Sequence, residues 1–460
     1  MPSFPSRLLG LITCTLAVYC LLAAPQLKAS SDQENAAQVD ALFKTFAGGN
    51  NPGVALGILR DGQPILKKGY GLADVVAALP ITSATIFRIG SVTKSFTAIA
   101  VLQQVESGKL SLDDPLSRYL PDFPRSKEIL IRHLLTHTSG VPDFVTLAQA
   151  AKMPLEFTPG TRINYSNTGY DLLGKVLEKV TGKKYAEVLH DSIFQPLGML
   201  HSGYDTTAEL PGRAQGYLLD PKGVYLPIPR EGIAEAFAAG GLYTTLDDMA
   251  RWEQALEAGK LLKPATLEMA STSNLLPGGR HTAYGMGFMT NRYRGLREVG
   301  HGGDINGFNA YVARYPEHGF AVIVLSNTGM RPPGLVPEGA FIAHHVAEIY
   351  LGSIMAKPEK LVAVPVAPAV LDSYVGRYEV DAAAPITDAM GRFMVMTRDG
   401  DHLIAEGKMG KLPFLPTSET NFRALGSPAE ITFVRDLQEK RPHMIISLMG
   451  LREFPAHPVD

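Results

Sequence analysis

The stretch that most constrains this chain is an apolar helical pattern that carries a lysine near its start. It runs from Phe87 to Gly108 as FRIGSVTKSFTAIAVLQQVESG. Ser91 and Lys94 are three positions apart, and on a helix such residues share one face, with Cβ atoms roughly 5–6 Å apart. The rest of the pattern is apolar nearly all round, which is typical of a buried helix. A lysine on a buried helix needs a specific role.

The serine and the lysine together suggest nucleophilic catalysis. A serine hydroxyl is a poor nucleophile until a base removes its proton, and a desolvated, neutral lysine can be that base. The positive end of the helix dipole disfavours a charged lysine and favours a developing serine alkoxide. Ser-x-x-Lys alone is common by chance and usually marks a solvated helix face. The apolar flank argues against that interpretation; it consists of Phe96, Ala98, Ile99, Ala100, Val101, Leu102 and Val105.

Composition narrows the class of protein. A length of 460 residues predicts two or three domains with ample core. A net charge of −2 provides no basic surface for nucleic acid, so we expect no nucleic-acid partner. Both cysteines, Cys14 and Cys20, lie near the start, so the remainder has no disulfide, no cysteine nucleophile and no thiolate metal site.

The first residues are typical of a targeting segment. Arg7 precedes an uninterrupted run of apolar and small residues at 8–24, and further small residues follow up to Ala29. The run is slightly shorter than the ~20 residues that a spanning helix needs, which favours a cleaved signal over a membrane anchor. We therefore expect a signal peptide at 1–29 and a mature protein that is exported, periplasmic or secreted, with no membrane span.

The order of predicted elements indicates an α+β fold. A helix is predicted at 38–46, a β-hairpin at 53–71 with its turn at Asp61-Gly62, and helices at 172–180 and 246–256. Strands return at 309–314 and 320–326, and a last helix follows at 340–351. We expect early and late strands to pair in one antiparallel sheet flanked by helices, beside a helical lobe. Ser91 then lies at the seam between the two, where clefts form.

The residue pattern changes toward the end of the chain. Residues 357–370 contain four valines and three prolines and are predicted to be an extended linker. Short alternating runs separated by Gly, Pro and Asp then predict a small all-β module at 371–460, either a sandwich or a barrel. These runs are Tyr374–Val380, Phe393–Thr397, Leu403–Glu406, Phe422–Ala424, Ile431–Val434 and Met444–Leu448.

Two further motifs have the composition to complete a site with Ser91 and Lys94. Tyr165-Ser166-Asn167 offers a hydroxyl that relays protons and an amide that holds both a carbonyl and a lysine. His301-Gly302-Gly303 precedes the late strands, and paired glycines let an edge-strand backbone approach a ligand closely. Taken singly, the first is usually a turn and the second a surface loop. It is their order in the chain that makes the set specific.

The ordered set SVTK, YSN and HGG resembles the three active-site motifs of the serine β-lactamase/penicillin-binding-protein superfamily. It is most similar to the branch of class C β-lactamases, D-stereospecific peptidases and esterases, and LLTHTSG at 134–140 and GGLYTT at 240–245 add to the match. The resemblance covers roughly residues 35 to 352, so we expect a catalytic domain at 30–356. The module that opens with YVGRYE at Tyr374 resembles, more weakly, the lipocalin-like domain often attached to such hydrolases.

The resemblance implies a role for each motif residue. Ser91 would be the acylated nucleophile, Lys94 and Tyr165 would transfer protons, and Asn167 would orient substrate and lysine. The backbone N–H groups of Ser91 and of Asp304, the residue after the HGG motif, would form the oxyanion hole. His301, Gly302 and Gly303 would line the substrate along their strand.

One departure from the resemblance concerns the substrate. Class C β-lactamases and most penicillin-binding proteins have a lysine where this chain has His301, and a histidine is mostly neutral at pH 7. We therefore expect a serine hydrolase of esters, D-amino-acid peptides or β-lactam-type amides, with a preference for the first two. The alternative is a penicillin-binding sensor without turnover, or a binding scaffold with the same fold. The sequence leaves the oligomeric state open.

Other chemistries have weaker support. The Gly-x-Ser-x-Gly elbow of α/β-hydrolases is absent, and so is a glycine-rich phosphate loop. His344, His345 and Glu348 form the nearest candidate metal cluster, but they lie in an apolar helical pattern and are interpreted as structural. His133 and His137 are better explained by hydrogen bonds between loop and helix. We expect no metal and no cofactor.

Overall fold

The structure of the protein is a computed structural model with side chains. It describes residues 32–44, 50–143, 145–205, 210–220, 222–229, 236–329, 338–358, 360–381, 387, 391–408, 410–435 and 441–459. The predicted signal peptide at 1–29 lies outside the described residues. Within them, no helix combines the length and the apolar character needed to cross a membrane.

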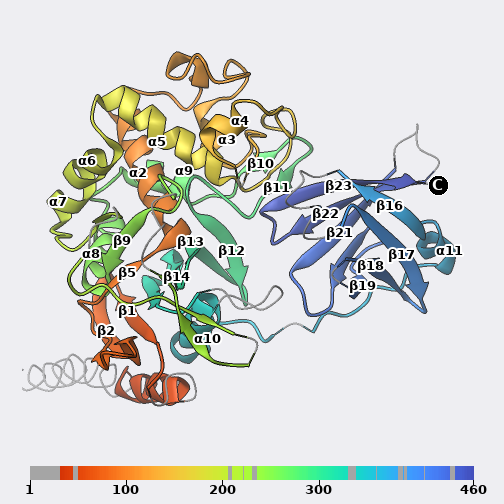
Figure 1. The fold of residues 1–460 in the computed structure, drawn as a ribbon. Helices are drawn as coiled ribbons and strands as arrows, with labels where there is room; N and C mark the ends of the chain where they lie inside the picture. Colours follow the sequence, from red (N-terminus) through yellow and green to blue (C-terminus); the bar gives the residue numbers. More distant parts are fainter. Residues whose placement is uncertain are drawn as a thin grey trace, which may run out of the picture.

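A six-stranded antiparallel sheet forms the centre of the first domain, in the order β12-β13-β14-β15-β1-β2 (Figure 1). Its strands are β1 (Val54–Arg60), β2 (Gln63–Tyr70), β12 (Met289–Tyr293), β13 (Leu296–Ile305), β14 (Phe308–Tyr315) and β15 (Phe320–Ser326). β1 pairs with β15 along its whole length, from Val54 opposite Ser326 to Arg60 opposite Phe320. The predicted pairing of early and late strands is therefore confirmed.

The two faces of this sheet belong to two separate cores, because successive side chains of a strand point to opposite faces. On β15, Val322 and Val324 pack with α10 (Glu338–Leu351) and with the helix at 32–44. The intervening Ile323 and Leu325 face the other side, toward α8 (Leu246–Glu257) and the helical lobe. The sheet is thus covered on both faces.

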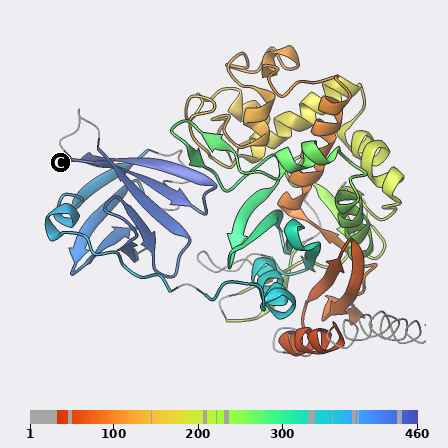
Figure 2. The same ribbon diagram turned by 180° about the vertical axis from the view of Figure 1, so that it is seen from behind.

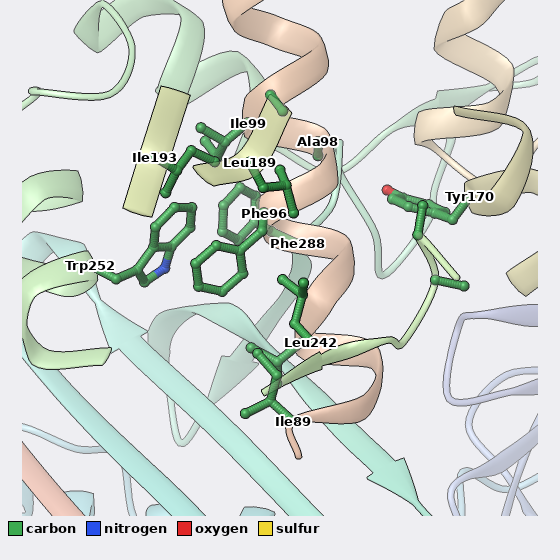
Figure 3. Packing of buried hydrophobic residues seen from close by; sticks show 14 of the residues in the cluster. Ile89, Phe96, Ala98, Ile99, Tyr170, Leu189, Ile193, Leu242, Trp252 and Phe288 are labelled. Carbon is green, nitrogen blue, oxygen red and sulfur yellow. The ribbon is translucent and has the colours of Figure 1, made fainter. Parts of the chain in front are cut away.

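The helical lobe is built around α2 (Thr93–Glu106), which is buried over most of its length as predicted. Phe96 of α2 stacks on Trp252 of α8 with ring centroids 3.9 Å apart, and Leu189 and Ile193 close the same cluster (Figure 3). The other lobe elements are α3 (Ile131–Leu135), α4 (Leu147–Ala150), α5 (Asn167–Thr181), α6 (Tyr185–Leu189), the π-turn η3 (His190–Phe194), α7 (Gln195–Leu197) and α9 (Pro264–Ala270).

Short strands and turns connect these two layers. β5 (Ile86–Arg88), β9 (Leu242–Thr245) and β6 (Gly203–Tyr204) form a small sheet that leads into the start of α2. The remaining pieces are β3 (Leu72–Asp74), β4 (Leu79–Pro80), β7 (Tyr217–Leu219), β8 (Tyr225–Pro227), β10 (Leu275–Leu276), β11 (Arg280–His281), η1 (Gly90–Val92), η2 (Leu116–Arg118) and η4 (Pro316–His318).

The C-terminal module is a closed antiparallel barrel. Its strands are β16 (Gly376–Val380), β17 (Phe393–Asp399), β18 (His402–Gly407), β19 (Gly410–Pro416), β20 (Asn421–Ala424), β21 (Ala429–Val434), β22 (His443–Leu448) and β23 (Arg452–Val459). Of the two predicted alternatives, sandwich and barrel, the barrel is found. β19 and β23 were not predicted, because the prolines in KLPFLP and REFPAHPV argue against strands.

The interior of the barrel is filled by its own side chains. Tyr374 stacks on Phe433 with ring centroids 3.8 Å apart, and Phe422 meets Phe433 edge-on at 5.6 Å. Leu371, on the short helix α11 (Pro368–Asp372) that ends the predicted linker, packs into the same core. Figures 1 and 2 show the barrel beside the first domain, and Arg280 of β11 pairs with Glu453 of β23 at 3.0 Å.

Candidate active site

Ser91 and Lys94 meet at the start of α2, as their spacing predicted. Ser91 lies in the tight turn η1 and Lys94 in the first turn of α2, and Lys94 Nζ is 3.0 Å from Ser91 Oγ. The lysine side chain is buried with 0% exposure, whereas Ser91 is partly exposed. The serine can therefore meet a ligand while the amine behind it is shielded from water.

The partners of Lys94 suit a neutral amine as well as an ammonium. Lys94 Nζ donates to Asn167 Oδ1 at 2.7 Å and to the Ala239 carbonyl oxygen at 2.7 Å. A neutral amine has two N–H donors and one lone pair, so it can donate to these two oxygens and accept from the Ser91 hydroxyl. This arrangement allows proton transfer from the serine to the lysine.

Burial and charge set the protonation of the site. Desolvation lowers the pKa of Lys94 to about 7, and Arg452 acts in the same direction, against the opposing effect of Asp143 and Asp171. Burial raises the pKa of Tyr165 above its ordinary range, although a hydrogen bond with the Ser91 side chain partly opposes the rise. Of the two groups, Lys94 is the one that loses its proton near neutral pH.

The YSN motif lies at the start of α5. Ser166 is the N-cap, and its Oγ accepts from the backbone N–H of Gly169 at 3.0 Å, which fixes where the helix begins. Asn167 follows in the first turn and reaches Lys94, while the Tyr165 ring lies 4.8 Å from Lys94 Nζ. The structure therefore brings the first two motifs together around one amine.

The HGG motif lies on β13, at a part of the strand that has lost its pairing with β12. β12 pairs with β13 only up to Gly300, and beyond that point η1 packs against the strand. A Cβ atom at Gly303 would lie 2.0 Å from the Ile89 carbonyl oxygen, and one at Gly90 would lie 2.9 Å from the Asp304 nitrogen. Only glycines allow this approach, which brings the Asp304 backbone N–H beside the Ser91 turn.

His301 is buried beneath this edge, with 3% exposure. Its Nδ1 lies 2.5 Å from the Gly302 carbonyl oxygen, which assigns the ring proton to that nitrogen, and its Nε2 accepts from the Tyr284 hydroxyl at 2.8 Å. Burial lowers the pKa of His301 to about 3, and the nearby Lys94 contributes to the decrease. The side chain is neutral at pH 7, and that it contacts substrate stays a prediction.

Two further residues, His137 and Asp171, complete the site although neither was predicted as a site residue. His137 packs between Tyr165 and Tyr284, and its Nδ1 accepts from the Ser166 backbone N–H at 3.0 Å. Asp171 accepts from the Ala239 N–H at 3.1 Å and so holds the peptide to which Lys94 donates. The LLTHTSG string was the available signal for His137, whereas no spacing indicates Asp171.

The histidines considered as metal ligands have other partners. His344 Nε2 is 2.9 Å from Glu298 Oε2, and His345 Nδ1 is 2.9 Å from the Phe341 carbonyl oxygen. His133 Nδ1 accepts from the Leu130 backbone N–H at 3.2 Å. Within the described residues, no three His, Cys, Asp or Glu side chains cluster in a way that would hold a metal ion.

Two curated relatives are similar to this chain. Putative penicillin-binding protein PbpX of Bacillus subtilis (strain 168) is 34% identical over 244 residues, which cover 50% of this chain and 60% of PbpX. Penicillin-binding protein 4* of the same organism is 28% identical over 413 residues, covering 82% and 89% of the two chains. The match to PbpX therefore spans less than two thirds of that protein's length.

Solved structures resemble the chain over one or both of its domains. The octameric penicillin-binding protein homologue from Pyrococcus abyssi has a TM-score of 0.61 and 27% identity, and covers 93% of this chain and 99% of its own. The D-amino acid amidase from Ochrobactrum anthropi SV3 has the same TM-score and identity, over 70% and 99%. EstCE1, a hydrolase with promiscuous acyltransferase activity, has a TM-score of 0.58 and 25% identity, over 69% and 99%.

The neighbours of the first domain thus include an amidase and a second hydrolase, in agreement with the motifs on η1, α5 and β13. A family model described as Beta-lactamase matches residues 39–347, the region that holds all three motifs. This chain belongs to the beta-lactamase family.

Proposed function

We propose that the protein is a serine hydrolase that works through a covalent acyl-enzyme on Ser91. The observation that carries the proposal is the 3.0 Å contact between Ser91 Oγ and a fully buried Lys94 whose pKa lies near 7. A base with a pKa near the working pH is suited to removing the hydroxyl proton. Family membership and the amidase and hydrolase neighbours support the same class of reaction.

In the acylation step, Ser91 Oγ attacks the carbonyl carbon of the substrate and its proton passes to Lys94 Nζ. The negative charge that develops on the carbonyl oxygen would be stabilised by the backbone N–H groups of Ser91 and Asp304. The carbon–leaving-group bond then breaks, and Tyr165 passes a proton from Lys94 to the leaving group. Asn167 keeps the lysine in place throughout.

Hydrolysis of the acyl-enzyme repeats these transfers with water. A water molecule attacks the ester carbon, and its proton passes through the Tyr165–Lys94 pair to Ser91 Oγ as the serine leaves. Tyr165 remains a neutral hydroxyl, because burial raises its pKa, and so it can donate and accept in turn.

For the substrate we propose esters and D-amino-acid amides or peptides rather than anionic β-lactams. His301 is neutral and buried, so this position offers no cation to bind a substrate carboxylate. The D-amino acid amidase from Ochrobactrum anthropi SV3 was solved with D-phenylalanine, which points to the same class of acyl group. A preference for D-phenylalanine amide over nitrocefin is therefore expected.

We also propose that the protein is exported, on the basis of the signal-like segment at 1–29. Such a hydrolase would act on substrates in the periplasm or outside the cell. Edman sequencing of the mature protein would check this proposal, which expects a start close to residue 30.

The test of the proposed function is turnover of p-nitrophenyl esters and D-amino acid amides by the wild type and by Ser91→Ala. Steady release of product that is lost in Ser91→Ala supports the hydrolase. A single burst equal to the enzyme concentration would identify a sensor without turnover, and no release from any substrate would identify a scaffold. Either result would overturn the proposal.

A further inference from the structure

The barrel reaches the active site through the turn between β22 and β23. The backbone N–H of Tyr165 donates to the Leu451 carbonyl oxygen at 2.9 Å, and that of Glu453 donates to the Ile163 carbonyl oxygen at 3.1 Å. Asn164 and Arg452 form the antiparallel bridge between these two bonds. The segment that leads into the YSN motif is therefore paired, main chain to main chain, with the start of β23.

Arg452 extends this contact with its side chain. Its Nη2 lies 2.5 Å from Asp143 Oδ2, its Nη1 donates to Asn164 Oδ1 at 3.1 Å, and its guanidinium lies 5.7 Å from the centre of the Tyr165 ring. The Asp143 side chain is 3% exposed and that of Arg452 is 16% exposed. One nitrogen of the guanidinium thus contacts the buried Asp143 carboxylate and the other the Asn164 side-chain oxygen, and the planar group holds both because its donors have a fixed geometry.

Asp143 connects this arginine to the catalytic lysine. Asp143 Oδ1 accepts from the backbone N–H of Asn167 at 2.7 Å and from Asn167 Nδ2 at 3.1 Å. With Nδ2 held by a carboxylate, the amide presents Oδ1 to Lys94 Nζ at 2.7 Å. The chain of contacts from Arg452 through Asp143 and Asn167 ends on the amine beside Ser91.

We propose that Arg452 of the barrel is a positioning residue of the active site, which acts through Asp143 to hold Asn167 and Lys94 in their working geometry. This inference rests on the proposed acylation of Ser91 and gives the barrel a part in it. The barrel interior is filled by residues such as Phe422 and Phe433, so its contribution lies at this turn. The catalytic domain is then incomplete without the barrel.

The experiment compares three full-length variants with the wild type. Arg452→Gln removes the charge and the fork, and Arg452→Lys keeps the charge without the fork. Arg280→Gln is the matched control. It removes the same charge from the other ion pair of this interface described above, Arg280–Glu453, which is not part of the contacts from Arg452 to Asn167. Labelling of wild-type Ser91 by a fluorophosphonate is established first, so that failure of the proposed function is recognised separately. Thermal melting identifies variants that do not fold.

The measurements are the rate at which the fluorophosphonate labels Ser91 (attack of Oγ on phosphorus with loss of fluoride), and kcat and KM for a neutral p-nitrophenyl ester. We expect Arg452→Gln to be labelled about 10- to 100-fold more slowly at pH 7, with a similar loss of kcat and little change in KM, since a small displacement of catalytic groups has effects of this size. Arg452→Lys should lose less, and Arg280→Gln should match the wild type. If Arg452→Gln does not fold, Arg452→Lys carries the same comparison.

The pH dependence distinguishes positioning from a merely structural role. The charged groups around Lys94 are Asp143 and Asp171, which raise its pKa, and Arg452, which lowers it, and the neutral His137 and His301 lie nearby. Without Arg452 the pKa of Lys94 rises. The labelling rate of Arg452→Gln should therefore rise with pH at a higher midpoint than that of the wild type. At pH values above this midpoint, part of the lost rate should return. Arg452→Lys should keep the wild-type midpoint.

Three results would overturn the proposal. One is a labelling rate and midpoint in Arg452→Gln equal to those of the wild type. Another is a loss of labelling rate that is equal in Arg452→Gln and Arg280→Gln and does not depend on pH. It would mean that both residues act only by holding the barrel against the first domain. The third is a raised KM for the p-nitrophenyl ester at unchanged kcat, which would make Arg452 a substrate contact.

Discussion

Lys94 and Glu298 are both buried ionisable side chains of the first domain, but their surroundings favour opposite protonation changes. Lys94 is 0% exposed, and its hydrogen-bond partners among the described residues are the neutral oxygens of Ser91, Asn167 and Ala239. Glu298 is 3% exposed and accepts from Tyr311 at 2.8 Å, from Tyr315 at 3.0 Å and from His344 at 2.9 Å. The surroundings of Lys94 therefore disfavour its charged form, whereas the surroundings of Glu298 favour its charged form.

The two pKa values follow from this difference. Burial lowers the pKa of Lys94 to about 7, since the attraction of Asp143 and Asp171 is too weak to compensate. Burial acts to raise the pKa of Glu298, but the hydrogen bonds from His344, Tyr311 and Tyr315 hold it below the ordinary value. Full satisfaction of a buried charge indicates a structural role, and an amine with a shifted pKa beside a nucleophile indicates a functional one.

The largest expected effect separates the two residues by activity. Lys94→Met should lower kcat/KM for p-nitrophenyl esters by about 10³- to 10⁴-fold, because it removes the proposed base for the Ser91 proton. Glu298→Gln, a change on the opposite face of β13 from His301, should keep activity close to that of the wild type. A Lys94→Met variant changed in KM alone would refute the role of Lys94 as base. A folded but inactive Glu298→Gln variant would refute the view that Glu298 has no part in activity.

The next effect concerns stability, where we expect Glu298 to matter. Glu298→Gln replaces one of the two acceptor oxygens by an NH2 donor, so at least one of the three donors (Tyr311, Tyr315 and His344) loses its acceptor, and the free energy of unfolding should fall by about 3 kcal/mol. Because the folded pKa of Glu298 is depressed, this loss should be complete above pH 4.5 and shrink as the pH falls below it. Denaturant unfolding at several pH values measures it, and equal stability of the two proteins at pH 7 would show that Glu298 is not structural.

The smallest effect is the pH dependence of stability that Lys94 itself causes. Its pKa is about 7 in the folded protein and 10.5 in the unfolded chain, so between these values the unfolded state binds more protons and stability rises with pH. Lys94→Met lacks this dependence. Its free energy of unfolding relative to the wild type should therefore decrease by about 2 to 3 kcal/mol from pH 6 to pH 9. A difference that stays constant over this range would mean that Lys94 keeps its ordinary pKa.

The parts of the fold that were predictable depend on local patterns. The hairpin around Asp61-Gly62 has the predicted turn, and α5 covers the helix predicted at 172–180 and ends at Gly182 in a left-handed C-cap. The Ser91–Lys94 contact follows from helical spacing alone. The strands β19 and β23 were missed because proline is unfavourable in most strands, whereas here the barrel accommodates Pro413 and Pro455 within paired strands.

The parts of the site that were missed depend on contacts between distant segments. Arg452 reaches Asp143 from another domain, and no spacing relates the two residues. The burial of His301 was not predictable either, because a histidine beside two glycines resembles an exposed loop. Its depressed pKa arises from packing that only the folded chain provides.

Mapping of a fluorophosphonate adduct as a function of pH tests whether Ser91 is the nucleophile and Lys94 is its base. The reaction is followed by intact mass and the modified peptide is sequenced, for the wild type and for Ser91→Ala. We predict one adduct on Ser91, formed at a rate that rises with pH through about 7 as Lys94 loses its proton, and none in Ser91→Ala. An adduct on any other residue, or a labelling rate that is unchanged in Ser91→Ala, would contradict it.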